Sequence, residues 1–239
     1  MRVGSGHVAL AWTGVSSAAR TAYCGSQVFG VHNRVRDGTV SSGWNEPGWG
    51  GVMQGLQDKT LCVYCGARPG TNPVHADQAR DLGVALAKLG GSLVYGGGSV
   101  GLMGVVSTAV IDAGGRVTGV IPEHLYSTEM AHGAVQSLEV VASMHVRKNR
   151  MIELADAIVA LPGGIGTLEE LAEALTWRQL GLHAKPLAVV DSDGYYSDLF
   201  ATLESMVDHG FADLDVLSAL RRFDTPDDLL QAWVAGTWG

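Results

Sequence analysis

The protein has 239 residues, of which 46% are hydrophobic and 17% charged, so the chain has enough apolar material for a folded core. This composition excludes an intrinsically disordered protein. The formal net charge of −8 argues against a protein that binds a nucleic-acid backbone, because such proteins usually carry an excess of basic residues.

The first 58 residues are rich in Gly, Ser, Trp and Asn and show no sustained strand or helix periodicity. We expect residues 1–58 to form a poorly ordered N-terminal extension and residues 59–239 to form one Rossmann-like catalytic domain. An alternative interpretation is that the native protein starts at Met53. No apolar run approaches the roughly 20 residues of a membrane helix, so we expect a cytoplasmic protein without a membrane partner.

From residue 61 onwards, short apolar runs alternate with amphipathic stretches. Several of the apolar runs lack alternation, which is typical of a parallel sheet covered on both faces. The predicted fold class is α/β, a three-layer, Rossmann-like, doubly wound parallel sheet with helices on both faces. We predict strands at 61–65, 92–95, 116–121, 138–141, 157–161 and 187–191, and helices at 75–89, 102–113, 144–155, 168–180 and 195–208.

The first predicted strand contains a C-x-x-C pair, Cys62 and Cys65, which invites a redox or zinc interpretation. No second such pair and no histidine pair completes a metal site. We therefore expect both cysteines to pack as small hydrophobic side chains in a buried strand, and we expect no bound metal.

Three loops that follow predicted strands are rich in glycine: residues 65–70, 96–101 and 162–167. Ligands of doubly wound sheets bind beyond the carboxyl ends of the strands, where such loops lie. Glycine lets the backbone approach an anion closely, and a helix N-terminus offers unpaired N–H groups. One such loop alone is equally consistent with a tight turn. Two at one edge of the sheet favour a nucleotide or sugar-phosphate site.

Charged residues flank two predicted helix starts. Thr167 and Glu170 have the spacing of a capping box, so Glu170 caps its own helix, lies at the lip of the site, or does both. The start of the helix at 144–155 is crowded with basic residues that oppose the helix dipole. They form either a solvated charged face or a cationic group that meets an anionic ligand. These residues are His145, Arg147, Lys148 and Arg150.

The combination of these motifs resembles one family. The sequence PGGIGTLEE at 162–170 is similar to the P-G-G-x-G-T-x-x-E signature of the Lonely Guy proteins, and MHVRK at 144–148 is similar to their M-H-x-R-K element. The elements CGA at 65–67, YGGG at 95–98 and GLMG at 101–104 are similar to further family elements in the same order. The resemblance runs from about residue 61 to the C-terminal region and leaves residues 1–58 uncovered.

This resemblance implies a hydrolase, a nucleoside 5'-monophosphate phosphoribohydrolase. Such an enzyme cleaves the N-glycosidic bond of N6-substituted adenosine monophosphates (cytokinin nucleotides), of AMP, or of both, and releases the free base and ribose 5-phosphate. The resemblance also implies a homodimer that needs no cofactor. Proteins of this kind are often labelled lysine decarboxylases, but the sequence shows no convincing lysine context for pyridoxal phosphate.

By motif, the resemblance implies that Arg147 and Glu170 are the catalytic pair. Two departures from the family pattern are Ala67, where serine is frequent, and Val146, where many members have glutamate. The implied substrate contacts are Gly96, Gly97, Gly98, Glu129, Lys148, Gly163, Gly164, Ile165, Gly166, Thr167, Leu168, Glu169 and Thr176.

Two other functions fit the same fold, because a fold does not fix a function. The first is a non-catalytic nucleotide-binding or carrier protein, which needs the glycine loops but not the pair formed by Arg147 and Glu170. The second is a nucleosidase with broad activity on 5'-monophosphates. Leu102, Met103 and the stretch 177–180 are candidates for the pocket that surrounds a base substituent, although such residues also suit a core.

Overall fold

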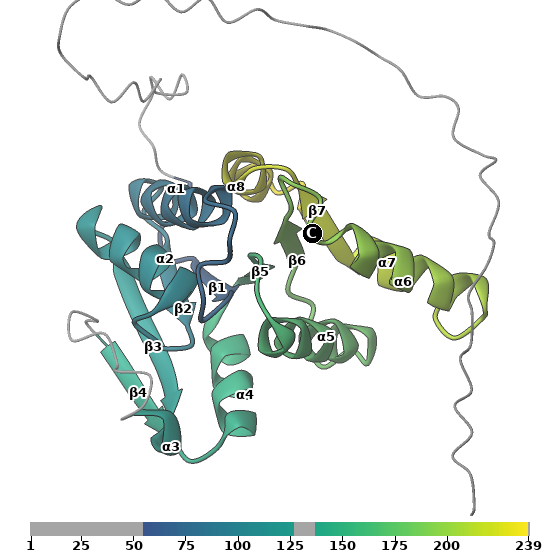
Figure 1. The fold of residues 1–239 in the computed structure, drawn as a ribbon, viewed down its shortest axis with the longest axis horizontal. Helices are drawn as coiled ribbons and strands as arrows, with labels where there is room; N and C mark the ends of the chain where they lie inside the picture. The colour runs from purple at the N-terminus through teal and green to yellow at the C-terminus, as the bar shows by residue number, and fades with distance from the viewer. Residues whose placement is uncertain (1–54, 127–136, 239) are drawn as a thin grey trace, which may run out of the picture. The chain divides into compact units, whose positions relative to one another are not determined.

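A computed structural model describes residues 55–126 and 137–238, and Figure 1 shows their fold. Within these residues, seven strands form one parallel sheet in the order β4-β3-β2-β1-β5-β6-β7. The strands are β1 (Thr60–Tyr64), β2 (Ser92–Tyr95), β3 (Arg116–Pro122), β4 (Ser137–Val141), β5 (Ala157–Ala160), β6 (Leu187–Val190) and β7 (Leu220–Phe223).

Helices connect successive parallel strands, as crossover connections in a parallel sheet require. The predicted doubly wound α/β fold is thus confirmed. The helices are α1 (Val74–Lys88), α2 (Gly101–Asp112), α3 (Glu123–Tyr126), α4 (Met144–Leu154), α5 (Ile165–Gln179), α6 (Ser197–Asp208), α7 (Asp215–Ala219) and α8 (Pro226–Val234).

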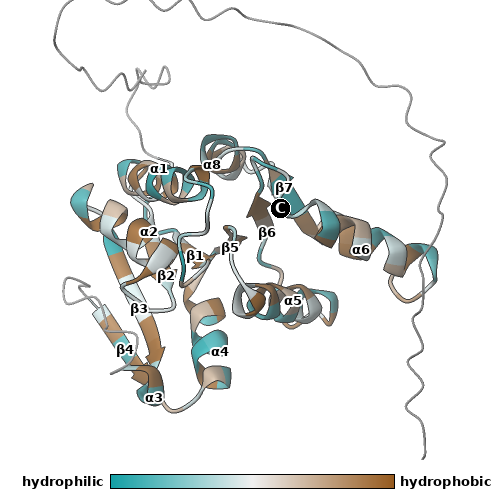
Figure 2. Cartoon of the chain, in the orientation of Figure 1, coloured by the Kyte–Doolittle hydropathy of each residue, from teal (hydrophilic) through white to brown (hydrophobic). Residues whose placement is uncertain are grey.

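The sheet separates two hydrophobic cores and gives the molecule three layers. Helices α1, α2 and α8 pack on one face, where side chains such as Leu82, Val106 and Leu229 form the core. Helices α4, α5, α6 and α7 pack on the other face with Met151 and Leu171. Figure 2 shows the strongly hydrophobic residues in the sheet between them. Burial on both faces explains why the strand sequences are apolar throughout.

The two cysteines of the C-x-x-C pair belong to different cores. Cys62 packs with the α4 and α5 layer, whereas Cys65 packs with the α1 and α2 layer. Both thiols are free and buried, and burial raises the pKa of each well above its ordinary value. Thiol nucleophiles and ligands need the thiolate form. The cysteines are therefore core residues, as the strand pattern predicts.

The sequence pattern does not predict two features at the ends of the described domain: a packed residue at the N-terminal end, and a strand and a helix at the C-terminal end. Leu56, which we assign to the N-terminal extension, is 2% exposed and its N–H donates to the Leu89 carbonyl over 3.1 Å. At the other end, β7 pairs with β6, and α8 packs against α1. Among the described helices, none has both the length and the apolar character to cross a membrane.

The order of the strands places the site. β1 pairs with β2 on one side and with β5 on the other. The connections that leave β1 and β5 consequently run to opposite faces of the sheet, and their first residues diverge. A crevice at such a point is the usual ligand site of a doubly wound sheet.

Candidate active site

A cavity of about 740 Å³ lies beyond the carboxyl ends of β1, β2 and β5. The loops after β1, β5 and β6, the end of β2 and residues from helices α1 to α5 line it. Its size suits a small molecule such as a nucleotide. The polar or charged side chains among its lining residues include Tyr64, Arg68, Thr71, Asn72, His75, Arg147, Thr167, Glu169, Glu170, Asp193 and Tyr195.

The loop at 162–167, which we call the glycine loop, delivers the N-terminus of α5 to this cavity. Gly164 is the N-cap residue of α5 and provides no side-chain cap for the first-turn amides. These amides lack intrahelical partners and carry the positive end of the helix dipole. A side-chain carbon added at Gly164 or Gly166 would meet no atom within 4 Å, so these two glycines leave open space in front of the amides. The loop can therefore bind an anion.

Arg147 lies on the first turns of α4 and is only 6% exposed. Its Nε donates to the Val120 carbonyl over 3.1 Å, and its Nη2 donates to the Gly96 carbonyl over 3.2 Å. Two backbone carbonyls at the ends of β3 and β2 thus fix the guanidinium at the cavity wall. A side-chain carbon at Gly96 would lie 1.8 Å from Nη2, so the position of Arg147 requires glycine there.

Glu170 faces Arg147 from helix α5. The distance between Arg147 Nη1 and Glu170 Oε1 is 3.7 Å, which is an ion pair but too long for a direct hydrogen bond. Both side chains line the cavity and both are largely buried. The two residues of the predicted catalytic pair are therefore brought together, from helices on the same face of the sheet.

The proposed capping box of α5 is wrong. The helix starts at Ile165, so Thr167 and Glu170 lie inside it and neither is the N-cap residue. The physical reason is that Gly164, which has no side chain, takes the N-cap position. Glu170 lies in the first turns of α5, and its carboxylate lies beside Arg147.

Lys148 lies next to Arg147 but is enclosed between two helices rather than exposed to the cavity. The residue is 3% exposed, and its ammonium bonds to Glu169 and lies 2.9 Å from Glu173. Burial alone would lower the pKa of Lys148, but the hydrogen bonds to the two carboxylates outweigh burial and raise it. The interpretation of the basic cluster as a solvated face is therefore wrong for Arg147 and Lys148, which are both buried.

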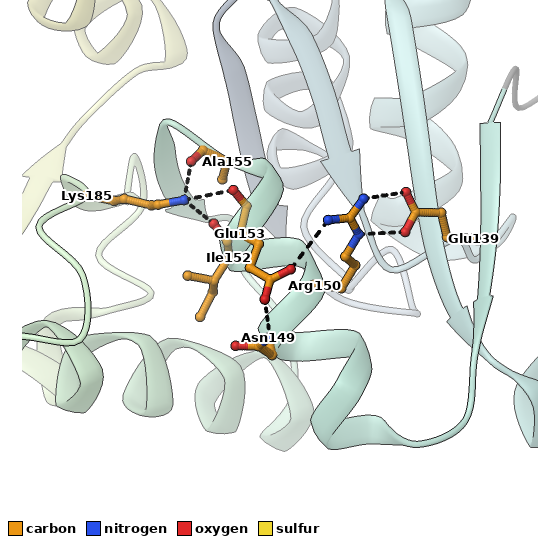
Figure 3. A network of polar contacts seen from close by, with 7 residues as sticks. All are labelled: Glu139, Asn149, Arg150, Ile152, Glu153, Ala155 and Lys185. Atoms are coloured by element: carbon orange, nitrogen blue, oxygen red, sulfur yellow. Dashed lines mark hydrogen bonds and ion pairs between the residues drawn. The ribbon is translucent and has the colours of Figure 1, made fainter.

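Polar contacts along α4 hold this helix in place, as Figure 3 shows. Arg150 makes two hydrogen bonds to the Glu139 carboxylate of β4, of 2.7 and 3.1 Å, which hold the pKa of Glu139 below its ordinary value. The Lys185 ammonium donates to the carbonyls of Ile152, Glu153 and Ala155 at the other end of the helix. These contacts fix the helix that carries Arg147.

A second polar group lines the cavity on the side of β6, and sequence reasoning did not identify it. His75 Nε2 lies 2.8 Å from Asp193 Oδ2, and the ring of His75 contacts Tyr195 edge to face. Burial alone would raise the pKa of Asp193, but the hydrogen bond and charge attraction of His75, together with hydrogen bonds from Asn72 and the Tyr195 backbone, outweigh it and lower the pKa. The Tyr195 hydroxyl donates to the Gly163 carbonyl. This group therefore supports the glycine loop from behind.

The remaining predicted substrate contacts differ in their relation to the cavity. Gly96, Gly163, Gly164, Ile165, Gly166, Thr167 and Glu169 line the cavity. Five others are described but do not line it: Gly97, Gly98, Lys148, Leu168 and Thr176. Thr176 is exposed two turns further along α5, where its hydroxyl donates to the Ala172 carbonyl. Glu129 lies outside the described residues.

Comparison with known proteins gives a family model and close relatives. The model described as "Possible lysine decarboxylase" matches residues 103–233. One cytokinin riboside 5'-monophosphate phosphoribohydrolase of Arabidopsis thaliana is 46% identical over 162 residues, which are 68% of this chain and 75% of that protein. Another from the same organism is 43% identical over 180 residues, which are 75% and 84% of the two chains.

The fold also occurs in solved structures. The molybdenum cofactor binding protein of Rippkaea orientalis superposes with a TM-score of 0.55 and 24% identity, over 72% of this chain and 93% of that one. At this identity the likeness shows the shared fold and nothing about the ligand.

Proposed function

Because the chain belongs to the Lonely Guy family of cytokinin riboside 5'-monophosphate phosphoribohydrolases, we propose that it hydrolyses the N-glycosidic bond of adenosine-type nucleoside 5'-monophosphates. The substrates are N6-substituted adenosine monophosphates, AMP, or both, and the products are the free base and ribose 5-phosphate. The observation that carries this proposal is the ion pair between Arg147 and Glu170, 3.7 Å apart at a cavity that also holds the glycine loop.

The glycine loop binds the 5'-phosphate in this proposal. The amides at the start of α5 donate to phosphate oxygens, and the helix dipole favours the negative charge. The open space in front of Gly164 and Gly166 leaves room for the phosphate.

Glu170 and Arg147 act on the ribose. Cleavage of the glycosidic bond leaves positive charge on the C1' carbon, as in other glycoside hydrolysis. The Glu170 carboxylate stabilises this charge and takes a proton from the water that attacks C1', while the departing base keeps the bond electrons and gains a proton. Arg147, fixed by two carbonyls, hydrogen-bonds to sugar or phosphate oxygens and orients the substrate.

The base occupies the apolar end of the cavity. The residues Leu102, Met103, Leu125, Met144 and Met151, from helices α2, α3 and α4, line the cavity there. Methionine side chains adapt to ligands of different shape, which suits a base with or without a substituent on N6. The stretch 177–180 does not line the cavity in the described structure, so we exclude it from this proposal.

Lys148 and Glu169 support the site in this scheme. Lys148 holds Glu169, which lines the cavity, at the start of α5. Direct substrate contacts by Lys148, Thr176, Leu168, Gly97, Gly98 and Glu129 stay predictions of the family resemblance. Family membership also leads us to propose a cytoplasmic homodimer; light scattering coupled to size-exclusion chromatography measures the oligomeric state.

The experiment is a substrate panel with chromatographic detection of the free base. We expect adenine and ribose 5-phosphate from AMP, or the substituted base from isopentenyl-AMP, and no release from adenosine. Glu170→Gln should abolish release while calorimetry still detects AMP binding, because the amide cannot accept a proton. Full activity in Glu170→Gln would rule out the assigned role. AMP binding without any release by the wild-type protein would instead favour the nucleotide carrier.

A further inference from the structure

We infer that Arg68 is a second phosphate-binding group, which contacts the 5'-phosphate from the β1 side of the cavity, opposite the amides of α5. This inference rests on the proposed function and adds a determinant of specificity for the phosphorylated substrate. It is carried by the position of Arg68, by the state of the other charges in the cavity, and by the chemistry of guanidinium groups.

The loop that bears Arg68 is held against the glycine loop. The Gly66 N–H donates to the Pro162 carbonyl over 3.1 Å, and the Gly66 carbonyl accepts from the Leu102 N–H over 2.9 Å. A side-chain carbon at Gly66 would lie 3.3 Å from the Cα of Gly163. Two residues further along, Arg68 lines the same cavity as the first residues of α5. An anion at the α5 amides therefore lies within the reach of an arginine side chain on this loop.

The acidic side chains of the cavity do not occupy Arg68. In the described part of the chain, three carboxylates line the cavity, and each lies beside a basic side chain other than Arg68: the pairs are Glu169–Lys148, Glu170–Arg147 and Asp193–His75. Asp193 also accepts a hydrogen bond from Asn72 over 3.1 Å.

Arg68 itself makes no hydrogen bond or ion pair with any residue that the structure describes. Its guanidinium therefore has no partner among the described residues and is available to bind a ligand. The guanidinium of Arg147, by contrast, is fixed by hydrogen bonds to the carbonyls of Val120 and Gly96.

A guanidinium suits phosphate because its planar N–H groups bind two oxygens at once. Ala67, the neighbour of Arg68, has no donor side chain, and Arg68 is the cationic side chain that this loop places among the residues lining the cavity. Together with the α5 amides, Arg68 contacts the phosphate from two sides. A nucleoside without phosphate would gain nothing from it, which makes Arg68 a determinant of the choice between nucleotide and nucleoside.

The test titrates ribose 5-phosphate into the full-length protein, because this product binds without turnover. We expect Arg68→Ala to weaken binding about tenfold, which is the size of one charge-assisted hydrogen-bond pair. Arg68→Lys keeps the charge but loses the planar fork, so it should recover part of the affinity. The matched control is Arg80→Ala, since Arg80 is exposed on α1, pairs with Asp77 and does not line this cavity.

Steady-state kinetics supply the second measurement. In Arg68→Ala the KM for AMP should rise about tenfold while kcat stays within twofold, because the inferred contact of Arg68 is with the phosphate and not with the ribose or the base. Wild-type affinity for ribose 5-phosphate and a wild-type KM for AMP in Arg68→Ala would overturn the inference and leave the proposed hydrolysis intact. Weakened binding in Arg68→Ala without any hydrolysis by the wild type would support Arg68 and refute the hydrolase. A wild-type protein that binds neither compound would overturn both.

Discussion

Replacement of Gly96 by alanine tests whether the position of Arg147 sets the rate. A Cβ at this residue would lie 1.8 Å from Arg147 Nη2, whereas such contacts essentially never fall below 3.0 Å. The guanidinium must therefore move by at least about 1.2 Å, and it loses its hydrogen bond to the Gly96 carbonyl. The fold should survive, because the atom that clashes is the end of a flexible side chain. A misplacement of about 1 Å costs roughly 100-fold in rate, or about 2.7 kcal/mol of transition-state stabilisation.

The assay is steady-state hydrolysis of AMP, with the thermal midpoint of unfolding measured on the same samples. The control is Gly164→Ala, because its Cβ enters open space and its φ of −90° accepts alanine. We expect Gly96→Ala to lower kcat about 100-fold. Gly164→Ala should instead raise KM, since the added methyl group occupies space in front of the α5 amides, with an unchanged midpoint. A Gly96→Ala protein with wild-type kcat would refute the reasoning about Arg147.

Three further outcomes follow from the described contacts. Arg150 lowers the pKa of Glu139 in the folded protein, so this pair stabilises the protein above the ordinary glutamate pKa. The stabilisation is lost as the pH falls through the folded pKa. Between pH 5 and 3 the wild type should therefore lose up to about 1 kcal/mol more stability in urea unfolding than Glu139→Gln does. Lys148→Met should destabilise the protein by about 1–3 kcal/mol, and a second substitution, Glu173→Leu, should restore part of that loss; equal stability of the single variant and the wild type would argue against the buried pair. Tyr195→Phe should raise the KM for AMP about threefold to tenfold with little change in kcat, since one hydrogen bond to the glycine loop is lost, and an unchanged KM would show that the loop keeps its position without it.

Local pattern was sufficient to predict most of the sheet, because strands buried on both faces leave apolar runs in the sequence. It did not predict β7, whose sequence LRRF places two exposed arginines in an edge strand. The start of helix α8 has a recognisable sequence pattern, because Thr225 precedes Pro226 and its hydroxyl accepts from the Asp228 N–H. The helix is too short for its periodicity alone to predict it. The pattern predicts the start of α5 three residues late, because the N-cap residue is a glycine, which has no side chain that would indicate a cap.

The candidate site was predictable only in part. Arg147 and Glu170 lie in recognisable motifs, but their spacing of 23 positions does not predict that the two side chains meet. The packing of α4 and α5 on the same face of the sheet brings them together. His75 and Asp193 were missed because they are far apart in sequence and neither belongs to a glycine-rich motif. Asp193 does lie just beyond the end of β6, so a search of every loop after a strand would have found it.

The three carbonyls held by Lys185 tie the far end of α4 to the segment before β6. Substitutions in that segment can consequently tilt the helix and change the separation of Arg147 from Glu170 without altering any residue of the cavity. Directed evolution of such an enzyme would therefore be expected to yield rate-changing variants around residues 183–186, none of which lines the cavity. Through Lys185, the distance between Arg147 and Glu170 depends on residues outside the cavity as well as on the residues that line it.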